Sequence, residues 1–149
     1  MGKTRIMRTN FYIIMRMCIL LLLINSCSNK CIVKNIEVSV LLSTVANEKS
    51  INYCELLRKA LTGDENSIKK LSLLEFDNAV GYDQGAVIVD LVTTLGETEY
   101  IKSISKINSE QKKIIHSYID VGLEYGNNSL VKGKNFKSAF PNLYFFLKE

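Results

Sequence analysis

The stretch GYDQGAVIVDLVTTLG, residues 81–96, decides the fold. The fourteen residues between its first and last glycines, 82–95, carry few polar side chains, so we expect this segment to lie at the centre of the molecule. Its β-branched residues would also suit a strand. Fourteen residues exceed the common length of a strand, however, and the segment is therefore predicted to be a buried helix.

Two shorter helices are predicted ahead of this segment. Asn47 and Ser50 are capping residues, and after them apolar residues recur at helical spacing from 51 to 61. Gly63 suits the end of that helix, and Asp64 can cap a second helix that runs to about residue 74. A connection this short between two helices predicts a tight helical hairpin.

Further helical segments are predicted after residue 96. The first covers residues 97–107, and Asn108 opens the second, which Gly126 ends. Pro141 suits the first turn of a terminal segment whose leucines and phenylalanines should dock on the core. The helix that Asn108 opens has an inward face, which we expect to carry Ile115, Tyr118, Ile119, Gly122 and Tyr125.

These segments predict an all-α fold, with one compact domain of about five to six helices over residues 47–149. Residues 27–46 are interpreted as a stalk between an amino-terminal leader and this domain. Ile36, Val38 and Val40 alternate with polar residues, so a short strand is one alternative for this region and a first helix is another.

Residues 1–26 are typical of a signal peptide. Lys3, Arg5 and Arg8 provide a basic start, and residues 17–24 form an apolar run. The stretch Leu23-Ile24-Asn25-Ser26-Cys27 resembles the lipobox of bacterial lipoproteins. The resemblance implies cleavage after residue 26 and a lipid anchor on the sulfur of Cys27.

A retained membrane helix and an ordinary secreted protein are the alternatives to a lipoprotein. A helix that crosses a bilayer needs about 20 apolar residues. Residues 11–24 provide fourteen, with Arg16 among them, so the sequence favours the lipid anchor. Ser28 is not acidic, and by the same resemblance we expect the protein in the bacterial cell envelope, on the periplasmic face of the outer membrane.

The charge of the chain depends on whether the leader is counted. The whole sequence has 19 basic and 15 acidic residues, but four of the basic residues and none of the acidic ones precede Cys27. The part after the leader is therefore neutral. A neutral body excludes nucleic acid as an expected partner, because binding to phosphates depends on surplus Lys and Arg, and it excludes a second, polybasic membrane anchor.

Two thiols are left once the leader is removed and Cys27 is lipidated, those of Cys31 and Cys54. They could pair in an oxidising compartment outside the cytoplasm. The alternative is two free thiols, one on the stalk and one packed as a small apolar residue.

Side chains that could support catalysis are few. The sequence has one histidine, His116, and none of the motifs of hydrolases, zinc proteases or phosphate-binding loops in the mature part. His116 stands beside lysines and isoleucines and is interpreted as a surface or boundary residue. We therefore expect no catalytic residue, no metal site and no cofactor, and a protein that is not an enzyme.

Acidic residues are concentrated in the middle of the chain. No lysine or arginine occurs from 71 to 101, and we expect this region to bind a cationic protein partner. The alternative is a set of carboxylates at helix starts and on solvated faces. The residues proposed to bind the partner are Glu75, Asp77, Tyr82, Asp83, Asp90, Glu97 and Glu99.

With the stretches 60–64, 81–85 and 122–126 as its turns and helix ends, the domain over about residues 47–147 resembles the small helical immunity proteins that bacteria carry against secreted toxins. The resemblance rests on size, helical pattern and envelope targeting and on no diagnostic motif. The resemblance implies that the protein neutralises a toxin in the periplasm by stoichiometric binding. A structural or assembly lipoprotein of the envelope is the second hypothesis, and an enzyme is the third.

Overall fold

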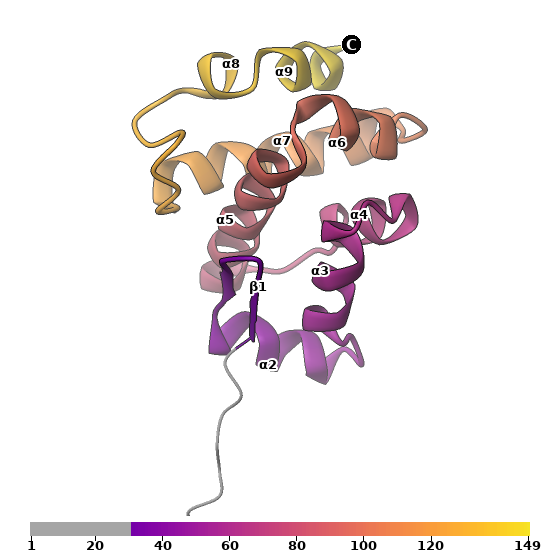
Figure 1. The fold of residues 1–149 in the computed structure, drawn as a ribbon, viewed down its shortest axis with the longest axis vertical. Helices are drawn as coiled ribbons and strands as arrows, with labels where there is room; N and C mark the ends of the chain where they lie inside the picture. The colour runs from indigo at the N-terminus through magenta and orange to yellow at the C-terminus, as the bar shows by residue number, and fades with distance from the viewer. Residues whose placement is uncertain (1–30) are drawn as a thin grey trace, which may run out of the picture.

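Helix α5 (Asn78–Leu95) forms the axis of the fold, and most other elements pack around it (Figure 1). The structure is a computed structural model that describes residues 31–149. Over these residues it has eight helices and one two-stranded hairpin, which confirms the all-α prediction with more helices than the five to six expected. Val87, Ile88, Leu91 and Val92 of α5 are at most 2% exposed. The segment that decides the fold is therefore its buried centre.

The start of α5 differs from the prediction. Gly81 does not bracket the helix but lies in its first turn, because the helix begins at Asn78. A Cβ atom at position 81 would lie 2.9 Å from the carbonyl oxygen of Phe76. The glycine thus allows a close approach of the preceding chain, and it is not a boundary signal.

Helices α3 (Tyr53–Leu61) and α4 (Glu65–Ser72) form the predicted hairpin. Gly63 has a φ of +88° in the connection, and the Asp64 side chain accepts a hydrogen bond from the Ser67 amide at 2.7 Å. The predicted cap of the first helix was wrong: Asn52, not Asn47 or Ser50, accepts from the Glu55 amide.

Residues 31–48 belong to the folded domain, so the predicted stalk over 27–46 is wrong for the part that the structure describes. Strands β1 (Cys31–Val33) and β2 (Ile36–Val38) pair antiparallel, and Lys34 and Asn35 turn between them with φ of 46° and 70°. Helix α2 (Val40–Glu48) follows. The reason is burial: this region places several apolar side chains in the core at 0–8% exposure, namely Cys31, Val33, Ile36, Val38, Leu42 and Ala46.

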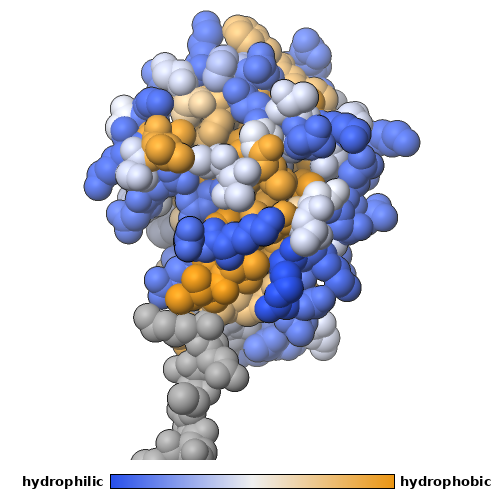
Figure 2. Space-filling view, in the orientation of Figure 1, coloured by the Kyte–Doolittle hydropathy of each residue, from blue (hydrophilic) through white to orange (hydrophobic). Residues whose placement is uncertain are grey.

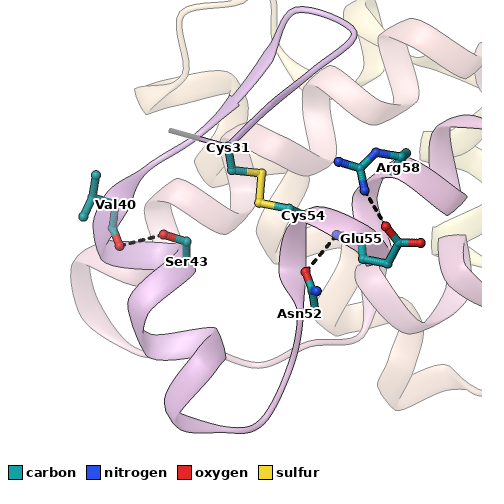
Figure 3. The surroundings of a disulfide bond; sticks show 7 residues. All are labelled: Cys31, Val40, Ser43, Asn52, Cys54, Glu55 and Arg58. Atoms are coloured by element: carbon teal, nitrogen blue, oxygen red, sulfur yellow. Dashed lines mark hydrogen bonds and ion pairs between the residues drawn. A yellow bond between two sulfur atoms is a disulfide. The ribbon is translucent and has the colours of Figure 1, made fainter. Parts of the chain in front are cut away.

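A disulfide joins Cys31 at the start of β1 to Cys54 in the first turn of α3 (Figure 3). The Cα atoms of the pair are 5.9 Å apart, and the two residues are 23 positions apart in the chain. Of the two alternatives for these thiols, the structure has the bridge. It holds the hairpin against the α3–α4 pair.

Helix α7 (Ser109–Tyr125) lies across α5, and the two helices form the most extensive contact of the fold (Figure 1). The predicted ends are confirmed. Asn108 and Gln111 form a reciprocal capping box at the start, and Gly126 follows the last residue. One assignment was wrong: Tyr125 is 57% exposed and does not face the core with Ile115 and Ile119.

Helices α6 (Glu97–Ile104), α8 (Phe136–Ala139) and α9 (Pro141–Lys148) form the end of the molecule opposite to α2 (Figure 1). The carboxy-terminal segment docks on the core through Leu143 and Leu147, as predicted, while Phe145 is 54% exposed. Helix α6 ends at residue 104, three residues before the predicted end, because the chain turns there through hydrogen bonds from the Ser105 and Ile107 amides.

A polar network lies inside this apolar core. Gln84 is fully buried; its amide donates to the carbonyl oxygen of Leu71 at 2.7 Å and its Oε1 accepts from the Tyr53 hydroxyl. The hydroxyls of Ser72 and Tyr100 bond to each other at 2.7 Å. Desolvation raises the pKa of both tyrosines, so they stay protonated and can donate.

Candidate functional site

A groove of about 810 Å³ runs along one face of α5. Its walls come from three parts of the chain: the turn and second strand of the hairpin, the exposed side of α5, and the loop that follows α7. Asp83 and Asp90 are the acidic residues of α5 that line it, together with Ala86, Thr93 and Thr94. These five positions follow helical spacing along one face, so α5 alone sets the order of the two carboxylates.

Each of these carboxylates holds one wall of the groove. The Ser39 hydroxyl, which also caps α2 by accepting from the Leu42 amide at 3.0 Å, donates to Oδ2 of Asp83. On the opposite wall, Nδ2 of Asn128 donates to Oδ1 of Asp90 at 2.8 Å. Oδ1 of Asn128 accepts from the Leu130 amide at 3.0 Å, which shapes the loop. The groove is thus fixed on both sides to a buried helix.

The charge of the groove is negative. Glu37, Asp83 and Asp90 line it with one lysine, Lys34. The Lys34 ammonium donates to the carbonyl oxygen of Leu61 at 2.8 Å. Burial raises the pKa of Asp90, and the hydrogen bond from Asn128 opposes that rise. The groove therefore carries a net negative charge that suits a cationic ligand. Part of this charge is shielded from water, and this shielding strengthens the attraction between opposite charges.

Exposed aromatic and aliphatic side chains stand beside the carboxylates. Tyr125 lines the groove and stacks on Tyr82, with ring centroids 4.9 Å apart. Tyr82 is 48% exposed, and Leu130 on the loop is 69% exposed. Tyrosines that combine an apolar ring with a polar tip are common anchors in protein interfaces. The groove thus offers both charge and apolar contact area.

The seven residues predicted to bind a partner do not all lie at the groove. Asp83 and Asp90 line the groove, and Tyr82 contacts it through Tyr125. Glu75 and Asp77 precede α5, while Glu97 and Glu99 follow it. At about 1.5 Å per residue these two pairs are separated by roughly 30 Å along the helix. The predicted residues therefore extend past both ends of α5, and of the carboxylates among them Asp83 and Asp90 line the groove.

The acidic residues at the ends of α5 make contacts within the domain. Oε2 of Glu97 accepts from the Leu143 amide at 2.7 Å, which caps α9 in place of Phe140, whose side chain makes no cap. Glu99 lies 3.9 Å from the Lys102 ammonium. The carbonyl oxygen of Glu75 accepts from the Lys49 ammonium at 2.9 Å. The alternative of helix-start and solvated carboxylates therefore describes Glu97 and Glu99, which lie in the first turn of α6, whereas the contact of Glu75 is made by its backbone.

Ser39, Tyr125, Asn128 and Leu130 are site residues that the sequence did not indicate. Tyr125 had been assigned to the core because it shares a helical face with Ile115. Asn128 and Leu130 lie in a polar loop, and Ser39 lies in the predicted stalk. No local pattern marks them, because they are brought to α5 only by the tertiary fold.

His116 packs at the boundary of the core, as predicted. Its ring lies edge-on to Phe136 at 5.0 Å, and Nδ1 lies 3.1 Å from Oδ2 of Asp120. Within residues 31–149, no group of three or more His, Cys, Asp or Glu side chains is arranged to hold a metal ion.

The leader and Cys27, the predicted lipidation site, lie outside the residues that the structure describes. Among residues 31–149, none of the helices has the length and apolar character needed to cross a bilayer.

The comparisons with known proteins assign the chain to no class. No family model matches the sequence, and no match is found among curated proteins or among solved structures.

Proposed function

We propose that this chain is a lipid-anchored binding protein of the bacterial cell envelope that holds a cationic protein partner in the groove along α5. More specifically, we propose that it is an immunity protein on the periplasmic side of the outer membrane. It would neutralise a toxin by binding it in a one-to-one complex. The lipobox-like stretch that ends at Cys27 supports the anchor.

The observation that carries the proposal is the pairing of fixed carboxylates with exposed tyrosines. Asp83 and Asp90 are held on a buried helix by hydrogen bonds from Ser39 and Asn128. A site that is already ordered loses little conformational entropy on binding. Tyr82 and Tyr125 add apolar area next to the charges, and this combination favours basic, aromatic or aliphatic side chains of a protein.

Stoichiometric neutralisation requires a rigid complementary surface and no chemistry. The order of the groove supports this proposal, because its floor is the most buried helix of the fold and both of its walls are bonded to that helix. Complementary charge would steer a basic toxin toward the groove and would make association depend on ionic strength.

The test is partner capture from native cells with the full-length, lipidated protein. Wild type should retain a protein partner, and Asp83→Asn/Asp90→Asn should retain less of it and lose most of the salt dependence. The matched control is Glu99→Gln/Glu110→Gln, which removes two exposed carboxylates outside the groove. Equal capture by both double variants at low salt would contradict the groove as the binding site.

The toxin hypothesis has its own test. A strain that lacks this chain should grow normally alone and should be killed beside sibling cells that produce the toxin. A growth defect without any attacker would instead support the structural or assembly lipoprotein.

A further inference from the structure

The chain enters the domain at the end formed by the hairpin and α2 (Figure 1). Cys27 precedes Cys31 by four residues, and a fully extended chain spans at most about 3.6 Å per residue. A lipid on Cys27 would therefore hold Cys31 within about 14 Å of the acyl chains' attachment point. The disulfide from Cys31 to Cys54 joins this entry point covalently to α3, so the chain at Cys31 cannot separate from the domain.

This same end exposes apolar side chains. Ile32 is 57% exposed, Val40 is 56% exposed and Leu41 is 46% exposed. Figure 2 shows hydrophobic atoms at the surface directly beside the point where the grey amino-terminal chain leaves the domain. Figure 3 shows the Val40 side chain directed away from the disulfide, toward the outside of the domain.

The exposed side of α2 has no charge for most of its length. Its first charged residue is Glu48 at the last position, and Thr44 is the exposed residue one turn after Val40 and Leu41. Leu42 and Ala46 fill the core from the opposite side of the helix. A surface helix normally carries polar and charged residues opposite its buried stripe, whereas α2 is apolar on both sides over its first turns. Such a face is typical of a surface that is covered in the working protein.

We propose that the surface made by Ile32, Val40 and Leu41, here called the α2 face, lies in the interface of the lipid bilayer when the protein is anchored. This inference rests on the proposed lipid anchor. The occupant is the membrane because an anchor at Cys27, four residues before Cys31, would keep this end of the domain within about 14 Å of the lipid. The mature chain carries equal numbers of acidic and basic residues, so apolar contact would supply the added attachment.

The proposal gives the domain a defined orientation. Apolar faces of peripheral helices enter about 5–10 Å into the region between headgroups and acyl chains. With the α2 face at that depth, α8 and α9 at the opposite end point into the compartment (Figure 1). The groove then opens beside the membrane, and the hairpin forms its wall nearest to the anchor.

Tryptophan fluorescence tests this directly, because the chain contains no tryptophan. Leu41→Trp and Ile32→Trp place single reporters on the α2 face, and Phe145→Trp is the matched control, a 54% exposed position on α9. Each full-length, lipidated variant is reconstituted into vesicles of phosphatidylethanolamine and phosphatidylglycerol whose acyl chains are brominated near the headgroup. Thermal unfolding of each variant verifies that the substitution leaves the fold intact.

We expect bromine quenching and a blue shift for Leu41→Trp and Ile32→Trp, and neither for Phe145→Trp. Quenching of Phe145→Trp alone would overturn the proposal, because the domain would then lie the other way round. A blue shift of Leu41→Trp without bromine quenching would also overturn it, because protein would then cover the α2 face.

Flotation with the same vesicles separates this inference from the lipid anchor. Wild type should float and Cys27→Ala should float much less. Failure of the wild type to float would refute the anchor itself. Flotation that depends on Cys27, combined with unquenched reporters at both positions, would refute the α2 face alone.

Discussion

Gly122 and Gly85 lie backbone against backbone where α7 crosses α5, and a Cβ atom on Gly122 would lie 2.1 Å from the carbonyl oxygen of Gly85. No side chain fits in that space without moving one helix. The crossing sets the position of α7 on the central helix, and thereby the position of the loop that forms one wall of the groove.

Gly122→Ala should therefore destabilise the protein. In an exposed helix interior, alanine is favoured over glycine by about 1 kcal/mol. Here the added methyl group overpacks the core, and we expect a net loss of about 1–3 kcal/mol in the free energy of unfolding. Denaturant titration measures it, with Ser117→Ala at an exposed position of α7 as the control. A more stable Gly122→Ala protein would show that the helices can separate at no cost.

Tyr53 and Gln84 should be energetically coupled. Tyr53→Phe leaves Oε1 of Gln84 without its buried donor, and Gln84→Leu removes both the acceptor of the Tyr53 hydroxyl and the side-chain donor to the Leu71 carbonyl. Each single change should cost about 1–3 kcal/mol. The double variant should cost less than the sum, with a coupling of about 0.5–3 kcal/mol by denaturant unfolding. Simple additivity would contradict the hydrogen bond, and Tyr125→Phe, which alters an exposed phenol, serves as the control.

The Cys31–Cys54 disulfide should contribute strongly to stability. It closes a loop whose ends are 23 positions apart, which in the chain-entropy account is worth about 3 kcal/mol. Thermal unfolding with and without a reducing agent should show the loss for the wild type. Cys31→Ala/Cys54→Ala should start at the lower stability and be insensitive to the reducing agent. Alkylation of the unreduced wild type should label neither residue, and labelling of both would disprove the bridge.

Asp90→Asn should stabilise the protein at neutral pH. Burial raises the pKa of Asp90, so the folded state binds a proton more readily than the unfolded state and the ionised carboxylate opposes folding. The amide can still accept the hydrogen bond from Asn128. The advantage of the variant should be largest at pH 7 and shrink as the pH falls toward about 4, the ordinary value of a carboxyl group.

Denaturant titrations at several pH values measure this difference. Ser117→Ala, at an exposed position of α7 without an ionisable group, is the control and should show little change over the same range. An advantage of Asp90→Asn that is independent of pH would show that desolvation of the charge is not its cause.

The helices that the sequence predicted best are those with complete local signals. Helix α7 has all of them: Asn108 caps its start, Gly126 follows its end, and the apolar stripe between them has the period of a helix. Asp64 marks the start of α4 in the same way. These signals depend only on neighbours within one segment. Residues 31–48 lack them, since each strand has three residues and their burial depends on distant side chains.

The groove could be predicted only in part. Asp83 and Asp90, both among the predicted binding residues, are seven residues apart and therefore share the face of α5 that lines the groove. Their partners are far away in the chain: Ser39 is 44 residues from Asp83, and Asn128 is 38 residues from Asp90. Helical periodicity reports a face of one helix and not what packs beside it. Tyr125 shows the same limit, because it shares a helical face with Ile115 but lies in the last turn of α7, where it is 57% exposed and stacks on Tyr82.

The position of the disulfide also decides how the domain would respond to a mechanical pull. Tension applied to the chain ahead of Cys31 passes through the two sulfur atoms to Cys54 and into α3. The intervening hairpin and α2 are bypassed by that covalent path and bear no load. Under such a pull, the hydrogen bond between Ser39 and Asp83, and with it this wall of the groove, would stay in place until α3 unfolds.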